Sequence, residues 1–224
     1  MHQLISKKVI IYLCLFFLLV TVNSSLISNL KLPKIEKIKI SGFNLNQSNE
    51  LRDVIKNLKS KNIFFINKYK TKKIFFSDNI VEELRIFKNY PSTLIIDIKK
   101  TKLLALTNKD GKDYFIGKNG KLIKKNESIP KLPFIFGDLD INEFLKLKNN
   151  IDKSNFKFKQ ISNLYYYKSK RWDIETTQGY LIKLPKENVS DSLNLFDRLH
   201  KEKNFTNKRI IDFRQKGQII LNAK

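Results

Sequence analysis

The sequence predicts an α+β protein with an N-terminal transmembrane helix, a strand–helix–helix–strand–strand domain, and a mostly antiparallel β-domain with flanking helices. Three patterns predict this fold class. A single apolar run, Val9–Val22, follows two lysines at the N-terminus. Residues 33–104 show the hydrophobic periodicity of a strand, two helices and two further strands, in this order. Residues 105–224 contain many short strand patterns separated by turn signals.

The apolar run is typical of an export signal or a signal anchor, because cations precede it and Asn23-Ser24-Ser25 follows it. The run alone is short for a membrane span and fits a cleavable signal peptide. Extended through Ile27, a helix reaches about 28 Å, which is enough to cross a bilayer. Because the run is followed by only a weak cleavage pattern, an anchor over residues 9–27 with a cytoplasmic tail at residues 1–8 is favoured over cleavage.

The composition limits the possible partners. A formal net charge of +23 would normally suggest nucleic acid or an anionic membrane. The lysines are spread evenly along the chain without a basic stripe, so a solvated surface is the better interpretation and no nucleic-acid partner is expected. The one cysteine, Cys14, lies within the apolar run, so we expect no disulfide and a fold held by its core.

The sequence contains no residue pattern typical of catalysis. His2 is terminal, His200 stands alone in a lysine-rich segment, and no cysteine–histidine set could bind zinc. The acidic pairs Glu82-Glu83 and Asp138/Asp140 fit strand-face and loop positions better than a metal or acid/base site. We therefore expect no enzymatic activity, no cofactor, no metal and no small-molecule substrate.

The first domain is predicted from its periodicity. Ile38 and Ile40 alternate with lysines as in a half-buried strand. The next helix has an apolar face and a candidate cap at Asn46 or Ser48, and Asn67 is the candidate cap of a second helix. Two further strands flank a proline turn. The apolar face of the first helix consists of Leu51, Val54, Ile55 and Leu58. The two strands are expected to bury Leu84, Ile86, Leu94, Ile96 and Ile98.

The second domain is predicted to contain two helices among its strands. The helices cover Ile141–Ile151 and Ser190–Leu199, the latter with a cap at Ser190 or Asn188. The predicted strands lie at residues 114–116, 121–123, 132–136, 161–167, 171–176, 180–184, 209–213 and 218–221.

Several motifs resemble known families. Ile38-x-Ile40-x-Gly42 and the segment from Tyr90-Pro91 to Ile98 resemble the POTRA domain of bacterial export and division proteins, although Lys99-Lys100 and Leu103 depart from the usual pattern. Three segments of the second domain resemble the β-domain of the FtsQ/DivIB cell-division family: residues 171–174, 178–185 and 209–214. The resemblance implies structural roles for Gly42, Tyr90, Pro91, Trp172, Gly179 and Asp212.

The resemblance also implies a function. Members of this family are bitopic scaffolds of the inner membrane with a single span, and their C-terminal region lies in the periplasm at the division septum. A scaffold that must stay at the division site needs a permanent tether, so the resemblance favours a retained anchor over a cleaved signal peptide. The implied partners are the coiled-coil division proteins FtsB and FtsL, bound by addition of a strand to a sheet edge. Carried over to this sequence, the binding residues are Phe213, Arg214, Gln215, Gly217, Gln218, Ile219, Ile220 and Leu221.

Two alternative functions remain open from the sequence. A POTRA-containing periplasmic chaperone or assembly factor for outer-membrane or secreted proteins would need several POTRA repeats or a barrel. An exported basic protein that binds polyanions would lose binding steeply as salt increases.

Overall fold

The computed structural model describes residues 7–22, 33–43, 49–125, 131–201 and 209–222. Helix α1 (Lys7–Val22) contains the apolar run, and its large side chains from Val9 to Val20 are exposed. Within the described ranges, none of the helices combines the length and apolarity that a membrane span requires. The expected anchor at residues 9–27 and the tail at residues 1–8 extend beyond the described residues.

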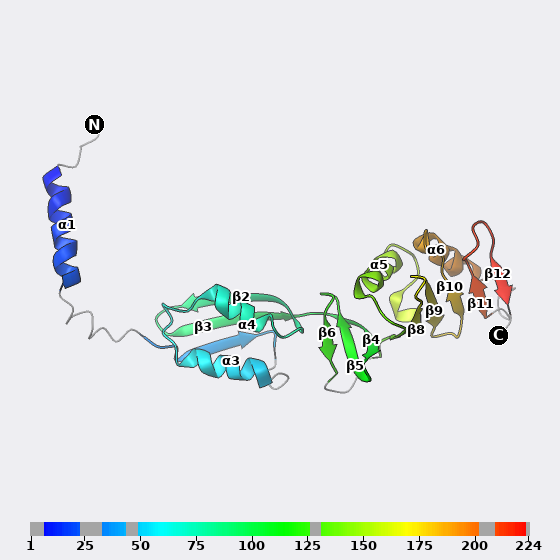
Figure 1. Cartoon of the computed structure of the whole chain (residues 1–224), viewed down its shortest axis with the longest axis horizontal. Helices are drawn as coiled ribbons and strands as arrows, with labels where there is room; N and C mark the ends of the chain where they lie inside the picture. Colours follow the sequence, from blue (N-terminus) through cyan, green and yellow to red (C-terminus); the bar gives the residue numbers. More distant parts are fainter. Residues whose placement is uncertain (1–6, 23–32, 44–48, 126–130, 202–208, 223–224) are drawn as a thin grey trace. The chain divides into compact units, whose positions relative to one another are not determined.

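The N-terminal domain has the expected strand–helix–helix–strand–strand order (Figure 1). Its three-stranded sheet has the order β1-β3-β2, and β1 pairs in parallel with β3. The elements are β1 (Lys37–Ser41), α3 (Asn49–Lys59), α4 (Lys68–Phe75), β2 (Val81–Asn89) and β3 (Thr93–Lys100).

The core of this domain confirms the apolar periodicity. Leu51, Ile55 and Leu58 of α3 are buried, and Val54 is half-buried. Both hairpin strands bury the expected alternate residues. Asn67 caps α4, because its Oδ1 accepts a hydrogen bond from Lys70 N at 3.1 Å. The candidate caps Asn46 and Ser48 lie outside the described residues.

The second sheet has nine strands in the order β12-β11-β10-β9-β8-β7-β4-β5-β6. It is mixed: β4–β7, β7–β8 and β10–β11 are parallel and the other pairs are antiparallel. The strands are β4 (Leu103–Lys109), β5 (Lys112–Gly117), β6 (Leu122–Lys124), β7 (Phe134–Phe136), β8 (Ile161–Tyr166), β9 (Trp172–Thr176), β10 (Leu181–Lys183), β11 (Ile210–Asp212) and β12 (Ile220–Asn222).

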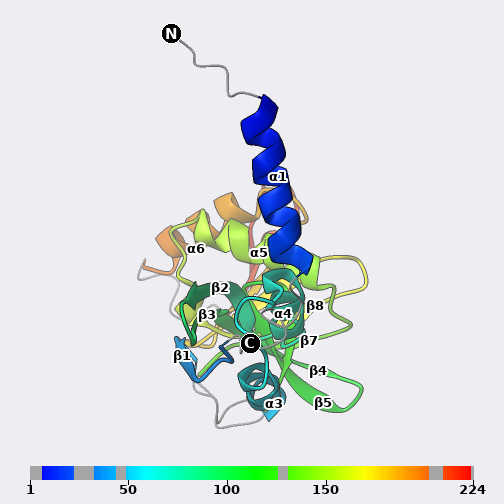
Figure 2. The ribbon, with the colours of Figure 1, turned by 90° about the vertical axis from the view of Figure 1, so that its left-hand side faces the viewer.

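Two helices, α5 (Ile141–Asp152) and α6 (Val189–Leu199), lie over one face of this sheet (Figure 1, Figure 2). Each helix follows one strand and precedes its parallel neighbour, as a crossover connection requires. The helices contribute Phe144, Leu147, Ile151, Val189, Leu193 and Phe196 to a core whose sheet side includes Ile135, Leu164, Ile174, Ile182 and Ile211.

Apart from shifts of one or two residues at the ends of other elements, the structure differs from the sequence prediction as follows. Strand β4 was not predicted. Asn188 occupies the N-cap position of α6, but it has a left-handed φ of 56° and its side chain makes no capping hydrogen bond. The last strand begins two residues later than predicted, because pairing with β11 starts only at Ile220 and continues to Asn222.

Segment 73–84 groups with the nine-stranded unit rather than with the rest of the N-terminal domain. Hydrogen bonds explain this grouping. Asn79 Nδ2 donates to Leu122 O at 2.7 Å, and Asn119 Nδ2 donates to Asn79 O at 2.9 Å. Thr101 N donates to Ile80 O at 2.9 Å, and the buried Thr101 Oγ1 accepts from Asn119 N at 3.1 Å. The hydroxyl of Thr101 therefore links the start of this unit to the β5–β6 turn.

The Thr101→Val substitution should lower the free energy of unfolding by about 1–3 kcal/mol, because it keeps the shape but leaves Asn119 N–H without its acceptor. Chemical denaturation monitored by circular dichroism measures the change. Thr177→Val at an exposed threonine is the matched control and should change stability by less than about 0.5 kcal/mol. Equal effects at the two positions would contradict the role assigned to Thr101.

Candidate partner-binding site

Strand β12 lies at one end of the nine-stranded order and pairs with β11. Among the described residues no strand pairs with its other side. Leu221 packs against the core, whereas Ile219 is 37% exposed and Ile220 is 38% exposed. An edge with unpaired backbone groups and exposed apolar side chains can accept an added strand.

The loop from Phe213 to Ile219 precedes this edge strand. Phe213 is buried in the core, and its N donates to Lys183 O at 2.9 Å. The turn is closed by Gln218 N, which donates to Gln215 O at 3.2 Å, and Gly217 has a φ of 76° that suits glycine. The predicted binding residues therefore lie together, but only Ile220 and Leu221 are in a strand.

A pocket of about 800 Å³ lies between this loop and helix α6. Leu184, Leu195 and Phe213 supply apolar lining, and the cationic side chains outnumber the acidic ones. The charged lining residues are Arg171, Lys186, Arg198, Arg214 and Lys216, with Glu187 and Asp191. Such a pocket fits a partner segment that presents apolar and acidic side chains together.

Arg214 is fixed at the pocket by Asp212 on β11. Its Nε lies 2.8 Å from each carboxylate oxygen, its Nη2 also bonds Oδ2, and its backbone N donates to Oδ1 at 3.0 Å. These hydrogen bonds, chiefly from the guanidinium, hold the pKa of Asp212 below its ordinary value. The same bonds raise the pKa of Arg214. Arg214 is therefore held in one orientation with its charge on the pocket wall.

Arg171 is held less well. Its Nε lies 3.6 Å from Asp173 Oδ1, and neither buried atom has a hydrogen-bond partner. Tyr167 Oη donates to the other carboxylate oxygen at 3.1 Å, and the Arg171 guanidinium lies over the Tyr167 ring at 4.7 Å. Burial raises the pKa of Asp173, although the nearby cations oppose this shift. Arg171 thus lines the pocket while its buried Nε lacks a hydrogen-bond partner.

The sequence did not predict that α6 forms one wall of this site. Leu195 and Arg198 come from α6, and Arg171 precedes β9. These residues are distant in sequence from Phe213–Leu221, and only the sheet order brings them together. A partial signal was available: a helix between two strands favours a parallel pair, which places α6 beside β11.

The residues expected to have structural roles occupy turn or core positions. Gly42 and Gly179 have φ angles of 74° and 84°, which suit glycine, and Tyr90-Pro91 belongs to the β2–β3 turn. Trp172 is buried, with ring centroids 4.6 Å from Tyr166 and 6.4 Å from Phe144.

The described part of the chain contains no group of three or more His, Cys, Asp or Glu side chains placed to hold a metal. His200 stacks on Phe196 at 5.1 Å, and its Nδ1 lies 3.1 Å from Phe196 O. These contacts identify His200 as part of the C-terminal turn of α6.

The Asp212→Asn substitution should lower the free energy of unfolding by about 1–3 kcal/mol at neutral pH, because a charged hydrogen-bonded pair is lost. The pKa of Asp212 is lowered in the folded protein, so its stabilisation is present above the ordinary pKa and is lost as the pH falls through the lowered value. The difference between variant and parent should therefore begin to shrink as the pH falls below about 4 and should vanish only when the pH is below the lowered pKa of Asp212. Asp152→Asn, at a surface pair with Lys148, is the control and should cost less than about 1 kcal/mol. A difference in stability that does not change with pH would contradict the role assigned to the ionised Asp212.

Comparisons with known proteins match both parts of the chain. Residues 34–100 match the family model of the FtsQ-type POTRA domain, and residues 105–214 match that of the C-terminal region of cell division protein FtsQ/DivIB. The cell division protein FtsQ of Rickettsia bellii is 24% identical over 191 residues, which cover 84% of this chain and 72% of that protein. DivIB of Clostridium botulinum (strain Loch Maree) is 33% identical over 155 residues, which cover 65% of this chain and 57% of that protein.

A solved structure of the major extracytoplasmic domain of DivIB from Geobacillus stearothermophilus aligns with 48% of this chain and 98% of its own, with a TM-score of 0.35 and 12% identity. The family assignment rests on the two family models, which together cover most of the described residues, and on the curated relatives. The chain belongs to the FtsQ/DivIB family of cell division proteins.

Proposed function

We propose that this protein is a bitopic scaffold of the bacterial division machinery that links early and late division proteins by binding them. In this proposal residues 9–27 anchor the chain in the inner membrane as a single span, with residues 1–8 in the cytoplasm. The POTRA domain (residues 33–104) and the β-domain (residues 105–224) lie in the periplasm at the septum. Its action is binding and not catalysis.

The observation that carries the proposal is the exposed edge of β12 beside a cationic pocket. Ile219 and Ile220 are exposed on the edge segment, and Arg214 is held at the pocket by Asp212. A partner strand paired with β12 would place its preceding or following residues near the pocket. Main-chain hydrogen bonds would then supply affinity, and the pocket would select apolar and acidic side chains.

The proposed partners are the small coiled-coil proteins FtsB and FtsL. The membership in a cell division family supports division proteins as partners. Binding experiments with FtsB alone, with FtsL alone and with both proteins together identify which of them the protein binds.

The Ile220→Glu substitution should abolish or strongly weaken capture of these partners by the detergent-solubilised protein, because it places a charge on the edge strand. The matched control is Ile74→Glu, the same change at an exposed residue of α4, which should bind as the parent does. A pull-down with purified partners measures the difference. Normal capture by Ile220→Glu, or equal loss in both variants, would contradict strand addition at β12.

The Arg198→Glu substitution tests the pocket. Arg198 is exposed and lines the pocket, so reversing its charge should slow association with an acidic partner and reduce the dependence of affinity on salt. The loss should be about tenfold in affinity at low salt. Lys153→Glu, at the C-terminus of α5 and outside the pocket lining, is the control. Equal association rates for Arg198→Glu and the parent would show that the pocket is not part of the interface.

A further inference from the structure

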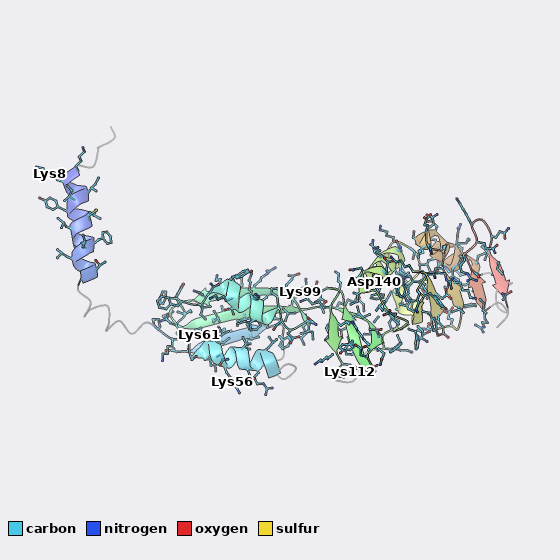
Figure 3. The ribbon with its side chains drawn as sticks, in the orientation of Figure 1. Lys8, Lys56, Lys61, Lys99, Lys112 and Asp140 are labelled. Atoms are coloured by element: carbon cyan, nitrogen blue, oxygen red, sulfur yellow. The ribbon has the colours of Figure 1, made fainter. Side chains whose placement is uncertain are left out.

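The chain enters the N-terminal domain between two loops. Ile35 N donates to Lys61 O at 3.0 Å, Ile63 N donates to Pro33 O at 3.4 Å, and Glu36 N donates to Ser92 O at 3.0 Å. The entry segment is therefore held on one side by the link after α3 and on the other by the β2–β3 turn. Figure 3 labels Lys61 at the end of the domain where the chain enters.

These two loops carry exposed aromatic side chains. Phe64 follows Ile63 and Tyr90 lies in the turn, and their rings stack with centroids 4.9 Å apart. Phe64 is 48% exposed, Phe65 77%, Tyr69 77% and Tyr90 54%. Tyr69 lies in the first turn of α4, four residues after Phe65. We call these four residues the entry aromatics. Large apolar side chains exposed together mark an interaction surface.

The charge around the entry aromatics is mostly positive. Segments 33–37, 61–70 and 88–92 form this end of the domain and contain one acidic residue, Glu36. Lys88 Nζ donates to Phe64 O at 2.9 Å, which holds one cation next to the stacked pair. The other lysines of these segments are exposed: Lys34, Lys37, Lys61, Lys68 and Lys70.

Aromatic side chains among lysines are typical of proteins that lie at the surface of a bilayer. Rings of this kind sit at the level of the headgroups, and lysines attract anionic lipids. Between the end of α1 at Val22 and the entry segment at Pro33 there are ten residues, which span at most about 36 Å. An anchored α1 would thus keep this end of the domain within reach of the membrane from which it emerges.

We propose that the entry aromatics dock on the outer surface of the bilayer, with the surrounding lysines contacting anionic lipid headgroups. This inference rests on the anchoring of α1 in the proposed function. Docking would fix the orientation of the domain at the membrane, because two loops and the first turn of α4 would contact lipid together.

The test uses the full chain reconstituted in vesicles of phosphatidylethanolamine and phosphatidylglycerol, with brominated lipid as a fluorescence quencher. Phe65→Trp adds a fluorescent tryptophan at the entry aromatics. The fluorescence of the parent protein, which comes from Trp172 alone, is subtracted as background. Asp53→Trp is the control, because its exposed side chain lies on α3 about 9 Å along the helix from Lys59, the last residue of α3. Brominated lipid should quench most of the fluorescence of the tryptophan at position 65 and little of that at position 53. In vesicles of pure phosphatidylcholine the quenching at position 65 should be weaker.

A second label separates the two proposals. Cys14, the one cysteine of the chain, lies on α1 and can carry an environment-sensitive dye in the same vesicles. A lipid-type spectrum from Cys14 together with no quenching of the tryptophan at position 65 would overturn docking while leaving the anchor intact. A water-type spectrum from Cys14 would overturn the anchor itself. If the tryptophan at position 65 were protected only after addition of FtsB and FtsL, the surface would be a protein interface and the lipid proposal would be wrong.

Discussion

The β-domain depends on one row of apolar side chains that crosses six strands in register. Ile135 pairs with Leu164, Leu164 with Ile174, Ile174 with Ile182, Ile182 with Ile211 and Ile211 with Leu221. All but Leu221 are buried, and the row lies under α5 and α6. A slip of one residue in any of these strands would turn its member of the row to the opposite face, so the row fixes the register of the six strands that it crosses.

The same row determines which side chains the exposed edge of β12 presents. Leu221 is the last member, and its packing on the core directs the neighbouring Ile220 and Asn222 to the opposite face. Asp212 pairs with Ile220 on that face, so the ion pair with Arg214 lies beside the exposed edge. Leu221 secures β12 through one half-buried side chain, while the outer side of the strand stays exposed.

Much of this arrangement could be predicted from the sequence, because its signals are local. The helix faces of α3, α5 and α6, the hairpin around Tyr90-Pro91 and the turn at Lys216-Gly217 follow from periodicity and turn chemistry. The pocket could not, because it depends on β10, α6 and β11 forming a parallel crossover. The left-handed Asn188 shows a similar limit: its residue type suggests a side-chain cap, but its backbone conformation decides the start of α6.

The buried aspartates Asp173 and Asp212 of the β-domain differ in how completely each is paired with an arginine. Asp173 and Asp212 both pair across the sheet with Lys183, yet their pKa values move in opposite directions. Asp212 receives well-aligned bonds from Arg214, whereas Asp173 is dominated by burial because Arg171 Nε stays 3.6 Å away. Arg171 Nε and Asp173 Oδ1 are both buried away from solvent, so this incomplete pair lies inside the domain and its free donor is not accessible from the pocket. Of these two arginines, only Arg214 is therefore oriented by a complete set of hydrogen bonds to its carboxylate.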